Sequence, residues 1–408
     1  MKPRVLYTAF DLVPSPKGAS IHITYFVRGL IAAGFDVTLI TAGDPSLPDC
    51  ELYYGATLLR VPWADDAHFL RRAVAFGAYV LEHIAQQPAY DVVHVRSIWS
   101  GFPLAQVKSE YGFKLLYEVN GLPSIEMKYH YPGLVGSQNN DDGDTVARPS
   151  LLDKLKEQEI ATLHAADAIV TPSQVTAAYI TSLRVAADKI TVIPNGFDEE
   201  QFGKSDEWPN EHEQSPMPVI LYVGTLADWQ GLDVLLHALA LVAAERPCQL
   251  RIVGRGRKRQ RKLLLKQARK LGVEENVVLE TAVAHSAIPA VIAQADVCVA
   301  PLGYNDRNVV QGCCPLKILE YMAVGKPIVA ANLPVVRELV CPDSEALLFT
   351  PDDPVSLAQQ IIAVLDHPEL ARKLGQQAAA RAWREFTWSL AQARLLAVYE
   401  ALGVRSLS

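Results

Sequence analysis

The sequence predicts an α/β protein made of two Rossmann-like domains, each with a doubly wound parallel sheet. Three observations carry this prediction. The chain has 408 residues, 50% of them hydrophobic, which is too many for one ordinary core. Short apolar runs alternate with helical periodicity along most of the chain. A polar, proline-containing stretch at residues 203–218 interrupts the alternation, and the same pattern then restarts.

The first half begins with the strand, loop, helix and strand that such a sheet needs. Residues 5–10 predict a strand, 14–20 a loop, 21–33 a helix that ends at Gly34, and 36–41 the next strand. Further strands are predicted at 91–95, 114–119, 168–171 and 190–193. Helices separate most of them, notably at 69–86 and 151–165. We expect the first domain to cover residues 1–202 and residues 203–218 to form a linker.

The second half repeats this organisation. Strands are predicted at 219–223, 249–253, 277–280, 297–300 and 328–331, with a helix at 232–245. We expect a second domain over 219–385, facing the first across a cleft. The amphipathic C-terminal helix, 386–408, is expected to cross back to the first domain.

Composition excludes several classes of protein. The formal net charge of −7 argues against nucleic acid as the main partner. The six cysteines show no CxxC or Cys/His spacing, which is typical of reduced thiols rather than of disulfides or a zinc site. The apolar run at residues 5–10 is short and leads into a Pro/Gly loop, so we expect it not to be a signal peptide. No apolar run reaches about 18 residues, so no membrane span is expected. We therefore expect a cytoplasmic protein and leave peripheral membrane contact open.

The stretch 312–339 carries the strongest chemical signal. Its Gly-Cys-Cys-Pro turn predicts a helix that starts at about Pro315, ends at Gly325 and leads into a buried strand. A helix N-terminus attracts anions. Lys317 and Glu320 lie three residues apart on one face of this helix. Anion site, cation and carboxylate together suit a nucleotide diphosphate whose ribose hydroxyls need an acceptor.

Polar residues near the ends of the first-domain strands leave alternatives open. The loop around Gly18 either brings backbone amides to a ligand or is only a turn; we favour the ligand, because strand ends of open α/β sheets bind ligands. His94 or Arg96 faces the cleft, or His94 is a satisfied strand-end histidine. Residues 118–126 are expected to line the cleft.

Two charged runs are also ambiguous. Residues 255–270 are strongly basic, which favours a solvated helix face and leaves membrane headgroups or an anionic acceptor as alternatives. The acidic residues 141–144 could hold a metal, but a mobile loop is the better interpretation because no apolar strand adjoins them.

Several motifs in this order and spacing resemble the family 4 retaining glycosyltransferases of the GT-B fold over nearly the whole length. They are the Gly18 loop, VIPNGFD at 192–198, YVGTLADWQGLDVLLHAL at 222–239, GRGR at 254–257, AQADVCVAPL at 293–302 and PLKILEYMAVGKPIVA at 315–330.

Three positions depart from the family pattern. In the Glu-x7-Glu pair, Glu320 is kept but position 312 is Gly. The Arg and Lys of the second-domain glycine loop fall on Thr225 and Gln230, and a histidine of the first domain on Asn120. We expect Lys317 and Arg255, together with amides of the Pro315 turn, to supply the missing positive charge.

The resemblance implies a retaining, metal-independent transferase that moves a sugar from a nucleotide diphosphate, expected to be UDP, to an acceptor hydroxyl. A sugar phosphate, a saccharide and a lipid-linked sugar are all open as acceptors. The nucleotide sugar is a substrate, so neither a cofactor nor a metal is expected. A nucleotide-sugar epimerase of the same fold and a non-catalytic nucleotide-sugar-binding protein are the alternatives.

The resemblance also implies roles for particular residues. The expected catalytic residues are Lys317, Glu320, Asn120 and Arg96. Donor contacts are expected from Lys317 and Glu320 and from Gly18, Ala19, Gly224, Thr225, Gln230, Arg255, Val283, Pro315 and Leu316. Acceptor contacts are expected from Lys17, Ser20, His22, Arg96 and Asn120.

Overall fold

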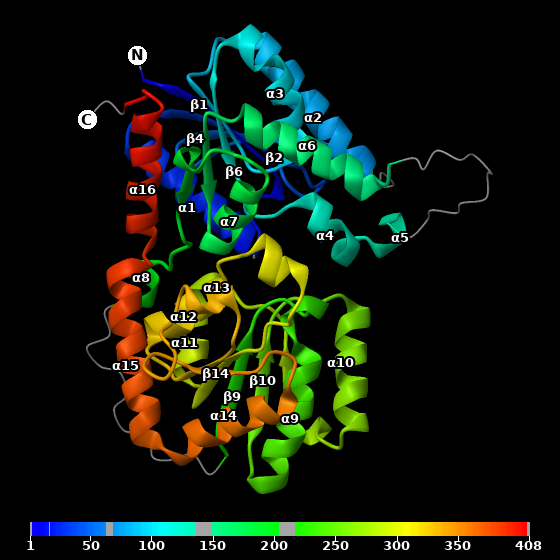
Figure 1. Ribbon diagram of the computed structural model, residues 1–408, viewed down its shortest axis with the longest axis vertical. Helices are drawn as coiled ribbons and strands as arrows, with labels where there is room; N and C mark the ends of the chain where they lie inside the picture. The colour runs from blue at the N-terminus through cyan, green and yellow to red at the C-terminus, as the bar shows by residue number, and fades with distance from the viewer. Residues whose placement is uncertain (1, 16, 63–67, 136–148, 204–216, 406–408) are drawn as a thin grey trace, which may run out of the picture. The chain divides into compact units, whose positions relative to one another are not determined.

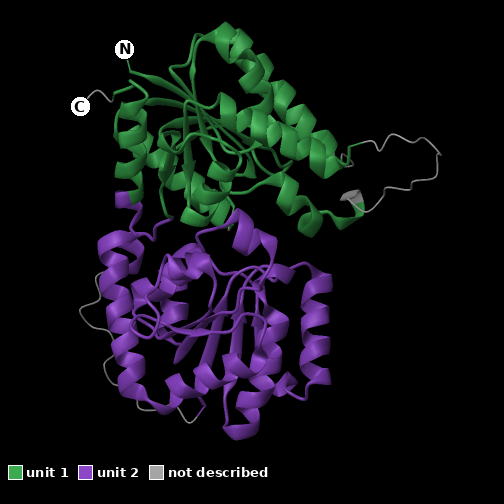
Figure 2. Cartoon of the chain, viewed as in Figure 1, with its two compact units in different colours: residues 1–194, 391–408 green, residues 195–390 purple. Residues whose placement is uncertain are grey.

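A computed structural model describes residues 2–15, 17–62, 68–135, 149–203 and 217–405 (Figure 1). The chain divides into two compact α/β units (Figure 2). Unit 1 comprises Met1–Pro194 and Ala391–Ser408, and unit 2 comprises Asn195–Leu390. The predicted fold class of two parallel-sheet domains is confirmed.

Unit 1 contains an eight-stranded sheet in the order β3-β4-β2-β1-β5-β6-β7-β8. Every neighbouring pair is parallel except β3 and β4. The strands are β1 (Arg4–Leu12), β2 (Asp36–Ala42), β3 (Cys50–Tyr53), β4 (Ala56–Val61), β5 (Val92–Val95), β6 (Lys114–Glu118), β7 (Ala168–Thr171) and β8 (Ile190–Val192).

Helices cover this sheet, so its central strands are apolar almost throughout. The helices are α1 (Gly18–Ala32), α2 (Phe69–Gln86), α3 (Ile98–Tyr111), α4 (Pro123–His130), α5 (Pro132–Val135), α6 (Leu151–Ala165), α7 (Gln174–Ser182) and α16 (Trp388–Ala401). Phe76 of α2, Leu104 of α3 and Leu163 of α6 belong to one buried cluster. The C-terminal helix joins this unit as expected, because Tyr399 packs on Phe35 with ring centres 5.3 Å apart.

Unit 2 contains a six-stranded parallel sheet in the order β11-β10-β9-β12-β13-β14. Its strands are β9 (Val219–Val223), β10 (Gln249–Val253), β11 (Val277–Glu280), β12 (Val297–Ala300), β13 (Ile328–Ala331) and β14 (Leu347–Phe349). Its helices are α8 (Glu199–Phe202), α9 (Leu232–Glu245), α10 (Lys258–Lys270), α11 (Ile288–Ala293), α12 (Leu316–Val324), α13 (Pro334–Arg337), α14 (Pro354–Asp366) and α15 (Pro368–Glu385). Contacts link α10 to α9 and α9 to α14, and separately α11 to α12 and α12 to α15.

The structure differs from the sequence-based expectation at several boundaries. The β3–β4 hairpin and β14 were not predicted; β3 is short and partly exposed, and β14 has three residues. Helix α1 begins at Gly18, so the expected loop is shorter. Residues 195–202 group with unit 2, where Phe197 donates its backbone N–H to Phe386 and packs on Trp383. The expected linker residues 204–216 and the acidic residues 141–144 lie outside the described residues.

Each sheet has one point where the strand order reverses, between β1 and β5 in unit 1 and between β9 and β12 in unit 2. The loops that leave the carboxyl ends of these strands run in opposite directions and open a crevice, which is where ligands bind in such sheets. These two points define where functional side chains should be sought.

Candidate functional site

The turns after β9 and β10 of unit 2 approach each other too closely for any residue but glycine. The backbone N–H of Gly224 donates to the carbonyl of Val253 at 3.0 Å. A Cβ on Gly254 would lie 1.7 Å from the carbonyl oxygen of Gly224. Gly231 has φ +69°, and a Cβ there would lie 1.8 Å from the carbonyl oxygen of Pro301, which follows β12. These glycines bring the loops of the switch point into contact.

Lys317 lies in the first turn of α12 and is only 8% exposed. Its ammonium donates to Oε1 of Gln230 and stands 4.0 Å from the ring centre of Tyr222. The Tyr222 hydroxyl donates to the backbone carbonyl of Thr225 at 2.7 Å. Burial lowers the pKa of Lys317 to about 7, although the Cys313 and Glu320 side chains oppose this shift. The ammonium is therefore poorly solvated and would be stabilised by an anion.

The ammonium of Lys317 also lies against the glycine turn. A Cβ on Gly224 would come within 2.9 Å of Lys317 Nζ. Pro315, expected as the first helical residue, is instead the extended N-cap residue with φ −67° and ψ 108°, and the helix starts at the half-buried Leu316. The structure thus brings together a cation, a glycine turn and a helix N-terminus, which is a combination suited to phosphate.

Glu320, one helical turn further along α12, is 7% exposed and has a different partner. Its Oε1 lies 3.0 Å from Nε2 of His285. His285 follows β11, two residues after the half-buried Val283. Among the described residues Lys317 and Glu320 form no ion pair with each other. Each side chain is thus held by its own partner rather than by the other.

Two residues that were predicted to contact the nucleotide-sugar donor are exposed. Arg255 follows β10, and its carbonyl accepts from the backbone N–H of Leu226 at 2.9 Å. Its guanidinium makes no ion pair or side-chain hydrogen bond within the described part of the chain. Thr225 is exposed and contributes its backbone carbonyl to Tyr222. Neither side chain is positioned by the protein itself.

In unit 1 the central feature is a fully buried carboxylate, Glu118, the last residue of β6. Its two oxygens are surrounded by donors from five other elements or loops. Arg96 Nε donates to Oε1 at 2.6 Å, and His22 Nε2 lies 2.9 Å from the same oxygen. His94 Nε2 lies 3.1 Å from Oε2. The remaining donors are the Tyr7 hydroxyl to Oε2 and the Asn120 amide to Oε1.

These contacts decide the charges in the Glu118 cluster. Burial alone would raise the pKa of Glu118, but the charges of His22 and Arg96 and the hydrogen bonds hold it well below its usual value. Burial lowers the pKa of His94. Because a neutral imidazole has one N–H, His94 directs it to Glu118 from Nε2 and accepts at Nδ1 from the Tyr399 hydroxyl, 3.0 Å away.

The predicted acceptor residues fall into two groups. His22, Arg96 and Asn120 meet around Glu118. Arg96 also reaches the partly exposed Asp11 at 3.1 Å. Lys17 is exposed, and the buried Ser20 hydroxyl accepts from the backbone N–H of Ser15 at 2.8 Å, which closes the turn before α1.

The loop expected at Gly18 and Ala19 is instead the start of a helix, and the expected ligand contacts of these two residues stay a prediction. Both residues are helical and belong to the first turn of α1, after the N-cap residue Lys17. The tight turn closed by Ser20 leaves enough chain for the helix to start three residues earlier than expected.

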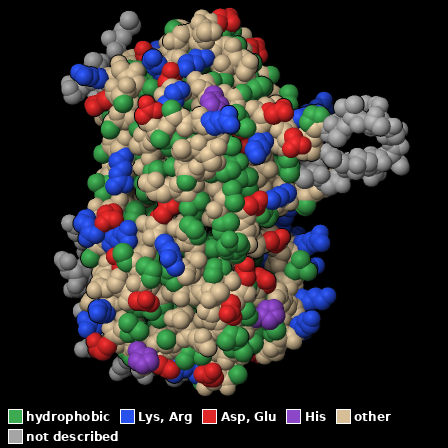
Figure 3. Space-filling model, viewed as in Figure 1, with side chains coloured by type: hydrophobic (Ala, Val, Ile, Leu, Met, Phe, Trp, Pro, Cys, Tyr) green, Lys and Arg blue, Asp and Glu red, His purple; other side chains and the backbone are tan. Residues whose placement is uncertain are grey.

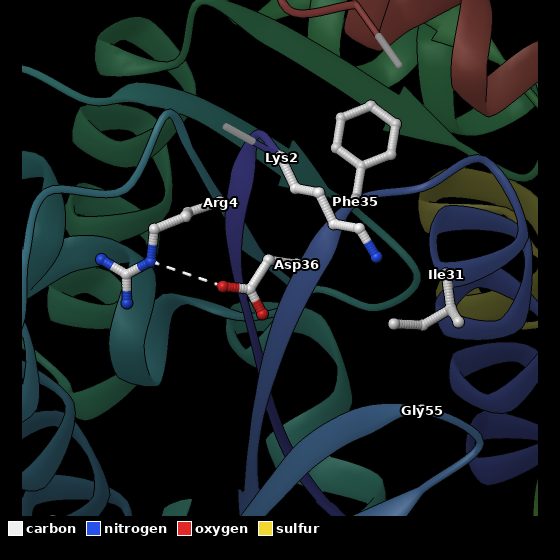
Figure 4. A pocket seen from close by; sticks show the side chains of 6 residues that line it. All are labelled: Lys2, Arg4, Ile31, Phe35, Asp36 and Gly55. Carbon is white, nitrogen blue, oxygen red and sulfur yellow. Dashed lines mark ion pairs between the residues drawn. The ribbon is translucent and has the colours of Figure 1, made fainter. Parts of the chain in front are cut away.

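A separate hollow of about 530 Å³ lies in unit 1 (Figure 4). Its lining residues are Lys2, Arg4, Ile31, Phe35, Asp36 and Gly55. Arg4 and Asp36 pair at 3.6 Å and begin the neighbouring strands β1 and β2. The hollow therefore lies at the amino end of the sheet, whereas Glu118 lies at the carboxyl end of its strand. It is not part of the candidate site.

The residues that the structure describes contain no group of three or more His, Cys, Asp or Glu side chains placed to hold a metal ion. None of their helices combines the length and the apolar character that crossing a bilayer requires.

Comparison with known proteins identifies the class of protein. A model described as Glycosyltransferase Family 4 matches residues 16–201, and one described as Glycosyl transferases group 1 matches residues 217–367. An uncharacterized glycosyltransferase from Methanocaldococcus jannaschii is 24% identical over 393 residues, 94% of each chain.

Two solved structures share the fold. Sucrose-phosphate synthase from Thermosynechococcus elongatus superposes with a TM-score of 0.80 at 21% identity, covering 98% of this chain and 99% of that chain. Anabaena HepE, solved in complex with UDP and glucose, superposes with a TM-score of 0.73 at 18% identity and covers 98% and 99%. The chain belongs to glycosyltransferase family 4 and has the GT-B fold.

Several residues of these two clusters were not predicted from the sequence. Glu118 was placed only in a cleft-lining run, although a carboxylate that ends an apolar strand must find donors, which was a usable signal. Tyr7 and Tyr222 look like ordinary strand residues. Tyr399 and His285 are far in sequence from their partners Glu118 and Glu320, so no spacing reveals them.

Replacing the buried carboxylate tests the Glu118 cluster. Glu118→Gln removes the buried anion of Arg96 and leaves it the partly exposed Asp11, so we expect a loss of about 3–5 kcal/mol in the free energy of unfolding. Tyr399→Phe removes one hydrogen bond and should cost about 1 kcal/mol. Urea unfolding measures both, with the exposed Glu157→Gln on α6 as a control.

The pH dependence of that loss has a defined sign. The pKa of Glu118 is lowered on folding, so its contribution is complete above the unfolded value of about 4.3 and disappears as pH falls toward the folded value. The stability gap between wild type and Glu118→Gln should therefore narrow as pH falls below about 4. A gap below about 0.5 kcal/mol at neutral pH would contradict the assignment.

Proposed function

We propose that this family 4 enzyme is a retaining glycosyltransferase that uses a UDP-sugar donor and an acceptor hydroxyl. The observation that carries the proposal is the buried ammonium of Lys317, held against Gly224 and over the ring of Tyr222 at the switch point of unit 2. A cation in such a place costs free energy unless an anion binds there. The Anabaena protein of the same fold, solved with UDP, supports a uridine diphosphate as that anion.

In this proposal unit 2 binds the donor. Lys317, the Gly224 turn and the start of α12 contact the diphosphate, and Gln230 holds the ammonium in place until the donor arrives. Glu320, oriented by His285, accepts from the ribose hydroxyls, and the backbone around Val283 contacts the base. Arg255 and Thr225 are exposed and would complete the phosphate contacts only when the donor is bound.

The chemical step breaks the bond between the anomeric carbon and the diphosphate oxygen. The acceptor oxygen forms its bond on the same face of the sugar, and the acceptor proton passes to the leaving phosphate oxygen. Negative charge develops on the diphosphate, and a fixed cation is the most effective group for stabilising it. Lys317 supplies that charge from the protein, so we propose a metal-independent transfer.

The acceptor contacts are proposed in unit 1, around the Glu118 cluster. Glu118 uses one N–H of the Asn120 amide and the Nε of Arg96, and Asp11 accepts from Nη1 of Arg96. The Asn120 carbonyl and Nη2 of Arg96 remain for a ligand. Arg96 and the exposed Lys17 favour an anionic acceptor. The fold shared with a sucrose-phosphate synthase supports a sugar phosphate over a neutral saccharide or a lipid-linked sugar.

Substitution of the two unit 2 residues tests the donor assignment. Lys317→Ala and Glu320→Ala should each lower sugar transfer by about ten-fold or more, because each removes a charged contact worth at least about 1.4 kcal/mol. The assay is a donor–acceptor array read by mass spectrometry, with EDTA present, and the control is the exposed Lys373→Ala on α15. Titration calorimetry with UDP, GDP and ADP then identifies the base.

The outcomes of this experiment separate the alternatives. Full activity in both variants would disprove the donor site, and binding of none of the three nucleotides would disprove a nucleotide-sugar donor. Donor turnover without an acceptor would indicate an epimerase. Donor binding with neither transfer nor hydrolysis would indicate a binding protein.

The lowered pKa of Lys317 predicts how UDP binding depends on pH. In the free protein the lysine loses its proton above about pH 7, and the diphosphate favours the protonated form, so binding takes up a proton. The affinity for UDP should therefore fall as pH rises from about 7.5 to 9, by up to about ten-fold per pH unit. In this range the terminal phosphate, with a pKa of about 6, stays ionised.

Lys317→Arg provides the matched comparison, because an arginine stays protonated throughout this range. Its UDP affinity should be nearly independent of pH. Equal slopes for wild type and Lys317→Arg would show that Lys317 does not titrate in contact with the nucleotide.

A further inference from the structure

Helix α10 concentrates positive charge in a chain that is negative overall. Residues 255–270 carry nine Lys or Arg and no Asp or Glu, whereas the whole chain has a formal net charge of −7. The helix lies along one edge of unit 2 in Figure 1, and Figure 3 shows Lys and Arg side chains along the same edge. Apart from Arg255, which precedes the helix, this charge takes no part in the donor site described above.

The exposed face of α10 consists almost entirely of cations. Leu264 and Ala268 are buried and face the rest of unit 2. At about 100° per residue, the exposed residues occupy an arc of roughly 140° centred opposite these two. The exposed arc comprises Lys258, Arg259, Lys262, Leu263, Lys266, Arg269 and Lys270.

This arrangement differs from that of a solvated helix such as α15. Helix α15 pairs opposite charges, as in the exposed Glu369 and Arg372 at 2.7 Å and the half-buried Arg381 and Glu385 at 3.0 Å. In the exposed arc of α10 four lysines follow one another at intervals of four residues, which is a mutually repelling spacing.

Most of these cations have no anionic partner among the residues that the structure describes. Arg269 pairs with Glu274 at the C-terminal end of the helix. Across the described ranges, no carboxylate pairs with the other five cations of the arc. The exposed arc thus carries lysines that repel one another and destabilise the helix locally. An anion bound from outside would reduce this repulsion.

We propose that the exposed arc of α10 is a docking surface for an anionic lipid bilayer. A straight stripe of about 12 residues is roughly 18 Å long and presents its charges to a plane rather than to a groove. Leu263, 54% exposed at one side of the arc, can enter the boundary between headgroups and acyl chains. The arc has no aromatic ring for stacking on bases, which argues against single-stranded nucleic acid.

The expected binding is electrostatic. Each Lys or Arg near an anionic membrane surface strengthens binding about five-fold. Five unpaired cations therefore give a substantial but salt-sensitive affinity. This inference does not depend on the donor or on the acceptor, so its test is independent of the proposed function.

Charge reversal of two central residues is the sharpest test. Lys262→Glu combined with Lys266→Glu lowers the net charge of the arc by four units. This should lower binding of the full-length protein to phosphatidylglycerol-containing vesicles by about a hundred-fold or more. Pure phosphatidylcholine vesicles should bind neither protein. The control is Lys154→Glu with Lys156→Glu on α6 of unit 1, which changes the net charge equally and should leave most of the binding intact.

Thermal stability separates docking from folding. In the double variant each reversed side chain stands four residues from an unchanged lysine, Lys258 or Lys270. Two of the three repulsive spacings therefore become attractive, and the one between positions 262 and 266 stays repulsive. The melting temperature should therefore stay the same or rise while vesicle binding is lost. Equal loss in the α6 control, or tighter binding to duplex RNA than to anionic vesicles at the same salt concentration, would overturn the proposal.

Discussion

The constraint on which unit 2 depends is the burial of one ammonium group. Lys317 is 8% exposed, and its ammonium contacts an amide oxygen and the face of an aromatic ring. Such an environment lowers its pKa and leaves it with capacity for an anion. The glycines at 224, 231 and 254 are needed because the loops that create this environment touch one another. The close contact between these loops therefore shapes the local fold of unit 2 and also creates the environment that lowers the pKa of Lys317.

Unit 1 buries a negative charge instead, the carboxylate of Glu118, and surrounds it with hydrogen-bond donors. Five side chains contact Glu118, and a sixth, Tyr399 of the C-terminal helix, contacts the other ring nitrogen of His94. The return of α16 to this unit thus has a chemical as well as a packing role. A saturated carboxylate stays ionised and rigid, so it can orient Arg96 and Asn120 without reacting itself.

The sequence predicted the fold class and most strands correctly because parallel strands covered by helices are apolar runs of a recognisable kind. It missed the β3–β4 hairpin because an exposed edge strand lacks such a run. The spacing of Lys317 and Glu320 correctly predicted that they share one helical face. It also suggested that they act as a pair, whereas each has its own partners in the structure. Their separate partners, Tyr222 with Gln230 and His285, come from other strands and loops, and only tertiary structure reveals such contacts.

Exchanging the partners of one hydrogen bond tests the central claim most directly, that a buried cation beside the Gly224 turn binds the donor diphosphate. Lys317→Gln should weaken UDP binding by about ten-fold or more. Combining it with Gln230→Lys returns a cation to nearly the same place, because the two side chains are in hydrogen-bond contact. Titration calorimetry should show that the exchanged protein regains most of the lost affinity. An exchanged protein that binds UDP no better than Lys317→Gln would contradict the account.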